Sequence, residues 1–144
     1  MKRIKIKGKE FKVIPEAKLV QGEMLEKSYA NDLRIGIKPI YKSILRHAVL
    51  HDEVFRRHTL NETNIIHANA YCDENDTWDE KRGIEVCAAK LELKNHRKLA
   101  KLYDRISRDL QEAAIIAQSF CFHHEDKAQA IEDDLCRTFG RLKM

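Results

Sequence analysis

The stretch from Ile65 to Leu93 limits the fold more than any other part of the sequence. Its first residues alternate between apolar and more polar side chains, which is the pattern of a strand with one buried face, formed here by Ile66, Ala68, Ala70 and Cys72. The residues from Asp73 to Asp76 are too polar and too rich in turn formers to extend this strand. The pattern therefore predicts a strand that ends at Cys72 and leads into an acidic loop.

A helix should follow this loop. Thr77 and Glu80 have the spacing of a capping box, in which each side chain accepts a hydrogen bond from the other residue's backbone N–H, so the helix should begin at Trp78. Its apolar residues recur at intervals of three and four, at Ile84, Cys87, Ala88 and Leu91. Glycine weakens a helix, so Gly83 is expected to allow another part of the backbone to approach.

Residues of this strand, loop and helix also resemble a known module. They are Cys72, Asp76-Thr77-Trp78-Asp79, Gly83, Val86, Ala89 and Lys90. Small bacteriophage and prophage proteins have a similar module, in which a strand ends in Cys and leads through Asp-x-aromatic-Asp to a helix containing Gly and Ala. The resemblance covers about residues 60–105. It implies an origin in a mobile genetic element and, because such proteins often act by binding, a role in binding host factors or ligands.

The length and composition fit one soluble domain spanning residues 1–144. The basic N-terminus lacks the apolar core of a secretory signal, and no run of residues is apolar enough for a membrane span, so we expect a cytoplasmic protein. The four cysteines form no C-x-x-C pair and are expected to be free thiols. Residues 1–60 carry 14 Lys and Arg against 7 Asp and Glu, whereas residues 61–144 carry 13 against 16.

The N-terminal residues 1–14 are expected to form a β-hairpin closed by Gly8-Lys9 in a type II′ turn. This turn would pair Ile6 with Phe11 and Ile4 with Val13, leaving Lys5 and Lys12 on the other face. Within residues 15–38, Leu33, Ile35 and Ile37 alternate like a short middle strand. Residues 40–57 should form one amphipathic helix, with a stripe made by Tyr41, Ile44, Leu45, Ala48 and Phe55.

The strand, loop and helix described first cover residues 64–93, and residues 96–142 are expected to form a helical hairpin. Asn95 would cap its first helix, and Asp126 with Gln129 would cap the second. Both helices carry long apolar stripes, so the hairpin could also join copies of the chain in a homo-oligomer. The whole chain is thus expected to be α+β, with a small antiparallel sheet made by the N-terminal hairpin and the middle strands, and with about four helices.

Two sets of residues are candidate sites. A basic face could bind phosphates or an acidic partner, although a solvated surface has the same composition; its residues are Lys5, Lys7, Lys9, Lys12, Lys42, Arg46, Arg56 and Arg57. His47 and His51 are spaced as an i,i+4 metal-binding pair, to which Cys121, His123 and His124 could add ligands. Histidines at the edge of a core, or near a helix end, would explain the same pattern.

Other chemistry finds less support. The acidic loop lacks the glycine and the final glutamate that an EF-hand needs at fixed positions. Glu92-Leu93-Lys94 matches the E-x-K of metal-dependent nucleases, a pattern that chance also produces in a chain with 35% charged residues. The common phosphate-binding, dinucleotide-binding, serine-hydrolase and zinc-protease motifs do not occur.

The sequence and the resemblance together favour a non-enzymatic binding protein, without a cofactor, that inhibits or sequesters a host component such as a defence system. Its partner would be a host protein or a small ligand. The alternatives are a nucleic-acid-binding protein that uses the basic face and a metal-dependent enzyme.

Overall fold

The computed structural model describes residues 1–60 and 65–140 of an α+β protein. Asn64, with which the predicted strand–loop–helix stretch starts, and the end of the predicted helical hairpin lie outside the described residues. The chain divides into two compact units, Met1–Ile106 and Ser107–Met144. None of the helices in the described part has the combined length and apolarity that a bilayer-spanning helix requires.

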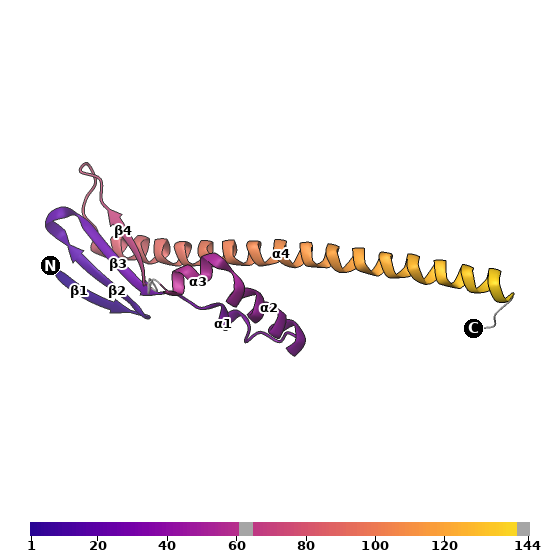
Figure 1. The fold of residues 1–144 in the computed structure, drawn as a ribbon. Coiled ribbons are helices and arrows are strands. Elements are labelled where there is room, and N and C mark those ends of the chain that lie inside the picture. Colours follow the sequence, from indigo (N-terminus) through magenta and orange to yellow (C-terminus); the bar gives the residue numbers. More distant parts are fainter. Residues whose placement is uncertain (61–64, 141–144) are drawn as a thin grey trace. The chain divides into compact units, whose positions relative to one another are not determined.

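The first unit contains a four-stranded antiparallel sheet in the order β1-β2-β3-β4 (Figure 1). The strands are β1 (Lys2–Ile6), β2 (Lys9–Ile14), β3 (Leu19–Leu25) and β4 (Ile65–Tyr71), and a 3-10 turn at Pro15–Ala17 joins β2 to β3. The alternation in β4 is confirmed, because Ile66, Ala68 and Ala70 are buried and their neighbours in the strand are exposed.

The predicted hairpin forms with a different turn and register. Ile4 pairs with Phe11 and Ile6 with Lys9, so Lys7 and Gly8 are the two turn residues. Both have positive φ angles, 47° and 79°, as a type I′ turn requires at both central positions. The pairing differs from the predicted one by two residues, and since side chains alternate with a period of two, Ile4 and Phe11 still share the predicted face.

The middle strand was predicted in the wrong place. Residues 33–38 form no strand, and β3 occupies Leu19–Leu25 instead, between β2 and β4. The buried positions of β3 alternate at Val20, Gly22 and Met24, but a glycine at the middle position removes the apolar signal from the sequence. A Cβ atom on Gly22 would lie 2.5 Å from the sulfur of Cys87, so the glycine is present because a helix crosses the strand there.

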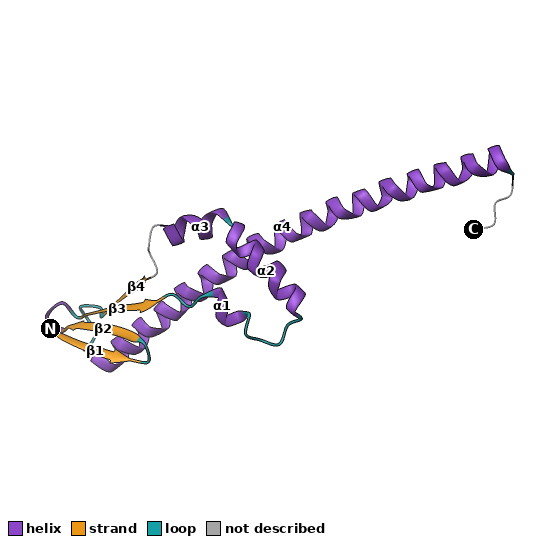
Figure 2. Cartoon of the chain, turned by 60° about the horizontal axis from the view of Figure 1, so that its bottom comes forward, coloured by secondary structure: helices purple, strands orange, loops and turns teal. Residues whose placement is uncertain are grey.

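That helix is α4 (Glu80–Phe139), which lies against one face of the sheet (Figures 1 and 2). The predicted apolar face is confirmed: Cys87 and Leu91 are fully buried among sheet residues, and Ile84 and Ala88 pack on them. Gly83 permits a close approach too, although its neighbour is the side chain of Val20, 2.9 Å from where a Cβ would lie, and not a backbone.

The start of α4 differs from the prediction. The helix begins at Glu80 and not at Trp78, and Asp79 occupies the capping position: its carboxylate accepts a hydrogen bond from the N–H of Arg82 at 3.3 Å. A negatively charged cap also interacts favourably with the helix dipole. Thr77 therefore lies too far before the helix to cap it.

The predicted helical hairpin of residues 96–142 is wrong, because α4 continues without a break to Phe139. Asn95 lies inside the helix and is fully buried; its side chain accepts a hydrogen bond from the N–H of Lys27 at 3.1 Å. Asp126 and Gln129 also lie inside α4, and no proline or glycine interrupts the sequence between Gly83 and Phe139. Capping residues alone do not end a helix whose backbone can continue.

The predicted helix of residues 40–57 is two helices, α2 (Pro39–His51) and α3 (Glu53–Leu60), preceded by the short α1 (Tyr29–Asp32). Asp52 interrupts it with an extended backbone and caps α3, because its side chain accepts from the N–H of Phe55 at 2.9 Å. The same carboxylate binds Arg105 of α4. These three helices lie beyond the end of the sheet (Figures 1 and 2).

Candidate binding surfaces

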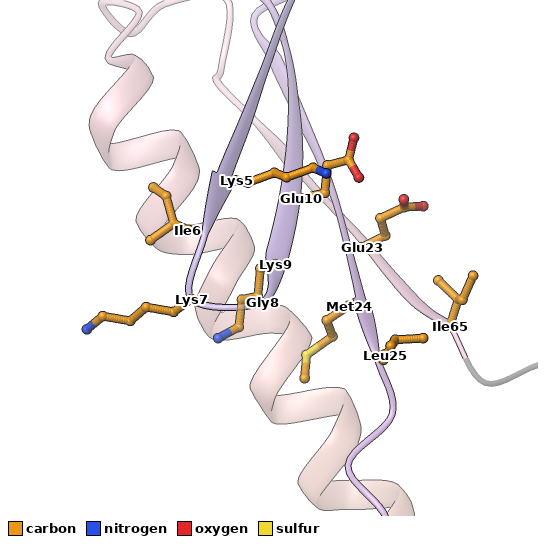
Figure 3. Close-up of a pocket in the computed structure, with 10 residues that line it drawn as sticks. All are labelled: Lys5, Ile6, Lys7, Gly8, Lys9, Glu10, Glu23, Met24, Leu25 and Ile65. Atoms are coloured by element: carbon orange, nitrogen blue, oxygen red, sulfur yellow. The ribbon is translucent and has the colours of Figure 1, made fainter.

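The cations predicted on the hairpin do not share one face. Lys5 and Lys12 lie on the outer face of the sheet, away from α4, and Lys7 lies in the turn. Lys9 is on the opposite face, where its side chain is 15% exposed and its ammonium lies 2.8 Å from Glu92 of α4. Figure 3 shows Lys7 pointing away from the other labelled side chains around a pocket of about 390 Å³ at this end of the sheet.

Acidic residues interrupt the outer face of the sheet. Glu10 lies 3.7 Å from Arg3, and Glu23 lies 3.8 Å from His67. Lys5 pairs directly across the strands with Glu10. The outer face is therefore a mixed surface, with the two signs of charge side by side, and is less suited to a phosphate backbone than a uniformly basic one.

The other predicted cations lie on helices. Lys42 and Arg46 are on α2, and Arg56 and Arg57 are on α3, where Arg57 is 3.9 Å from Glu53. Figures 1 and 2 show α2 and α3 outside the sheet that carries the hairpin cations. The eight residues predicted as one basic face therefore come from a hairpin and two helices, and the four on the hairpin do not share one face.

The predicted metal ligands do not form a cluster. The rings of His47 and His51 are neighbours on α2, with centroids 4.2 Å apart in an edge-to-face arrangement. Cys121 and His123 belong to the second unit, where the thiol of Cys121 lies 3.5 Å from the carboxylate of Glu125. Among residues 1–60 and 65–140, no three His, Cys, Asp or Glu side chains are grouped so that they could hold a metal ion.

The two charged residues of the E-x-K pattern have separate structural partners. Glu92 lies between Lys9 and Lys27, and the hydrogen bond from Lys9 holds the pKa of this carboxyl below its usual range. Lys94 donates to the backbone carbonyl of His67 in β4 at 2.5 Å. Both residues connect α4 to the sheet. Within the described residues, neither belongs to a group of side chains that could hold a metal ion.

The structure contains an apolar pocket that the sequence did not reveal. It has a volume of about 500 Å³ and lies between the segment after β3, α3 and α4 of the first unit. Its apolar lining comes from all three segments: Leu25, Tyr29, Val54, Phe55, Leu99 and Leu102. The rings of Tyr29 and Phe55 meet edge to face with centroids 5.5 Å apart, which is a favourable arrangement for aromatic pairs.

Charged residues border this pocket, and most of them are cations: Lys27, Lys98, Lys101 and Arg105, with Glu26 as the acidic residue of the lining. Lys98 binds Glu26 at 2.5 Å, and Lys27 binds Glu92 at 3.2 Å. Arg105 forms a two-point contact with Asp52. These ion pairs fix the walls of the pocket, and Lys101 adds a positive charge at its border.

A partly buried hydrogen bond also connects α4 to α1, which begins at the pocket residue Tyr29. The hydroxyl of Tyr103 donates to the carboxylate of Asp32 at 2.6 Å, which ties α1 to α4. Burial, together with this hydrogen bond, raises the pKa of the Tyr103 hydroxyl. In the sequence, the only sign of the site is the spacing of three and four between Lys98, Lys101 and Arg105, which also fits a solvated helix face.

No protein-family model, curated protein or solved structure matches the chain.

Proposed function

We propose that this chain is a non-enzymatic binding protein of bacteriophage or prophage origin that sequesters a host protein through the pocket between β3, α3 and α4. The observation that carries the proposal is the combination of an apolar floor and a mostly cationic border in one concave site. The origin in a mobile element is supported by the resemblance of residues 60–105 alone.

The chemistry of the pocket defines the partner. Val54 and Leu25 are 52% and 70% exposed, so a partner that covered them would remove apolar surface from water. The other bordering cations are paired with carboxylates of the chain itself, so Lys101 is the residue that favours a carboxylate of the partner beside the apolar side chains. A segment of a host protein that presents apolar residues flanked by Asp or Glu meets both requirements, and Arg105 and Tyr103 keep the site formed before the partner arrives.

A capture experiment with the full chain tests this function. The immobilised protein is exposed to extract of the host cells after nuclease treatment, and the retained proteins are identified by mass spectrometry. Val54→Glu should abolish retention of the partner, because it places a carboxylate on the apolar lining. Leu50→Glu is the matched control: Leu50 is 51% exposed on α2, does not line the pocket and should leave retention unchanged.

A second pair of variants tests the charge. Lys101→Glu should weaken retention about tenfold or more, whereas Arg97→Glu, on the same helix but outside the lining, should not. Equal retention by all four variants would refute the pocket as the binding site. If proteins are retained from an untreated extract but not from the nuclease-treated one, nucleic-acid binding would replace protein binding as the function.

A further inference from the structure

The second unit presents an apolar helix surface that its own residues leave exposed. Within residues 107–140, every side chain is exposed except those of Leu110, Glu132 and Leu135, which are half-buried. The exposed set includes large apolar residues: Ile115, Ile116, Phe120, Phe122, Ile131 and Phe139. The segment from Ala113 to Phe122 contains no charged residue, although 35% of the whole chain is charged. Phe120 and Ile131 lie on the same side of the helix, whereas Ile115 and Phe122 lie on the opposite side. Exposed apolar surface on a helix is typical of an interface.

The spacing along this helix indicates what covers it. One stripe of side chains follows the helix. Its residues recur at intervals of three and four both before Phe120 and after Cys121, and we call the peptide bond between Phe120 and Cys121 the central step. The stripe consists of Leu110, Ala113, Ala117, Phe120, Cys121, His124, Ala128 and Ile131. With about 100° of rotation per residue, these side chains fall within a band of roughly 120° on one side of the helix. In the first unit, the same spacing continues through Leu102 and Ile106, which the chain's own core buries.

The stripe is symmetric about the step from Phe120 to Cys121. Ala117 lies as far before the step as His124 lies after it, and Leu110 corresponds in the same way to Ile131. A two-fold axis through the step would therefore place Leu110 of one copy against Ile131 of the other, and Ala113 against Ala128. Two-fold interfaces use the same surface in both copies, so a palindromic stripe is self-complementary in an antiparallel pair.

The charges favour this orientation over a parallel one. Acidic residues concentrate after the step: Glu125, Asp126, Glu132, Asp133 and Asp134. A parallel pair would place these residues beside the same residues of the second copy, where like charges repel. An antiparallel pair places Glu125, Asp126 and Asp134 beside uncharged residues and Asp133 beside Arg108, and only Glu132 then faces an acidic residue, Asp109. The acidic character also disfavours nucleic acid as the occupant.

We propose that the second unit forms an antiparallel homodimer through this stripe, with the two-fold axis at the step from Phe120 to Cys121. The overlap of residues 107–134 is about 40 Å long, so the pair would bury on the order of 1,000 Å² in total, at the lower end of specific interfaces. A dimer carries two copies of the pocket in the first unit and can bind a host assembly at two points.

Sedimentation equilibrium of the full chain under reducing conditions tests the dimer. The expected mass is twice the 16.9 kDa of one chain. Phe120→Glu should give a monomer, whereas Phe122→Glu should remain a dimer, because residue 122 lies about 200° further around the helix. Phe120 and Phe122 are 62% and 55% exposed, so the two variants are matched in residue type and exposure. A wild-type monomer at the highest soluble concentration, or dissociation by Phe122→Glu, would overturn the proposal.

A short thiol cross-linker tests the orientation. In the antiparallel pair the two Cys121 side chains meet near the axis, whereas the two Cys136 side chains lie about 45 Å apart. Cross-linking should therefore persist in Cys136→Ser and disappear in Cys121→Ser. In a parallel pair each cysteine lies beside its own counterpart, so a cross-link through Cys136 would overturn the antiparallel arrangement.

Discussion

Arg105 of α4 holds Asp52 by two hydrogen bonds, from Nε to Oδ1 at 3.0 Å and from Nη2 to Oδ2 at 2.9 Å. The Asp52 side chain is 6% exposed and the Arg105 side chain 33% exposed. Asp52 also caps α3 through the N–H of Phe55. Asp52 therefore ends α2 through its extended backbone, and its carboxylate both caps α3 and binds α4 next to the apolar pocket.

Replacing Asp52 should destabilise the first unit. Asp52→Ala removes the ion pair and the cap, and leaves the guanidinium of Arg105 partly buried without this partner; we expect a loss of roughly 2–4 kcal/mol in the free energy of unfolding at neutral pH. Asp52→Asn should cost less because asparagine can still cap α3. Urea denaturation followed by circular dichroism measures both changes, and equal costs for the two variants would contradict a role for the cap.

The contribution of Asp52 should depend on pH. The hydrogen bond from Arg105 lowers the pKa of Asp52 in the folded state. A lowered pKa means that the folded state favours the ionised form, so the stabilisation is complete above the unfolded-state value of about 3.9 and is lost as the pH falls through the folded-state value. The difference in stability between the wild type and Asp52→Ala should therefore be constant near neutrality and shrink below about pH 4. A difference that stays constant throughout this acidic range would exclude the ion pair as its source.

Adding a methyl group at Gly22 should destabilise the sheet–helix interface. In Gly22→Ala the new Cβ would lie 2.5 Å from the sulfur of Cys87 and 3.0 Å from Cδ1 of Leu91, and both residues are fully buried. Overpacking of this kind costs about 1–3 kcal/mol, measurable by urea denaturation.

Two further variants give the control for Gly22. A Cβ at Gly36 meets nothing within 4 Å, so Gly36→Ala should be neutral or slightly stabilising. Cys87→Ala removes the clashing sulfur, so Gly22→Ala should cost less in that background than in the wild type. Independent, additive effects of the two substitutions would show that the contact with Cys87 is not the cause.

The sequence predicted the elements whose signal is local. The period of two in Ile65–Tyr71 and the apolar positions from Ile84 to Leu91 agree with the structure because each depends on a single buried face. Lys9 and Asn95 were misassigned for the opposite reason. Lys9 is turned toward α4 by the hairpin register, and Asn95 is buried by the chain after β3, so the decisive contacts join residues far apart in the sequence.

The candidate site illustrates the same limit. Val54 and Lys101 meet around the pocket only because Asp52 breaks the predicted helix of residues 40–57 and turns α3 toward α4. At this break Asp52 binds Arg105, and no local pattern encodes a contact between positions 52 and 105. The predicted helical hairpin failed because capping residues and apolar stripes are equally compatible with one continuous helix.

The cap of α4 can be located by two matched alanine variants. Asp79→Ala should lower stability by about 1 kcal/mol because it removes the acceptor for the N–H of Arg82. Thr77→Ala should change stability by less than about 0.5 kcal/mol, since Thr77 is exposed and lies before the helix. Thermal denaturation distinguishes the two, and the reverse order of effects would restore the capping box of Thr77 and Glu80.

Asn95 should hold in place the segment after β3, which contains the pocket residue Lys27. Its Oδ1 accepts a hydrogen bond from the N–H of Lys27 at 3.1 Å, and Asn95 is fully buried. Asn95→Ala leaves this N–H without its acceptor, so we expect a loss of about 1–3 kcal/mol and faster hydrogen exchange at the Lys27 amide. His96→Ala is the control, because the neighbouring His96 side chain is 70% exposed. Exchange at Lys27 that is unchanged in Asn95→Ala would show that the hydrogen bond does not hold this segment in solution.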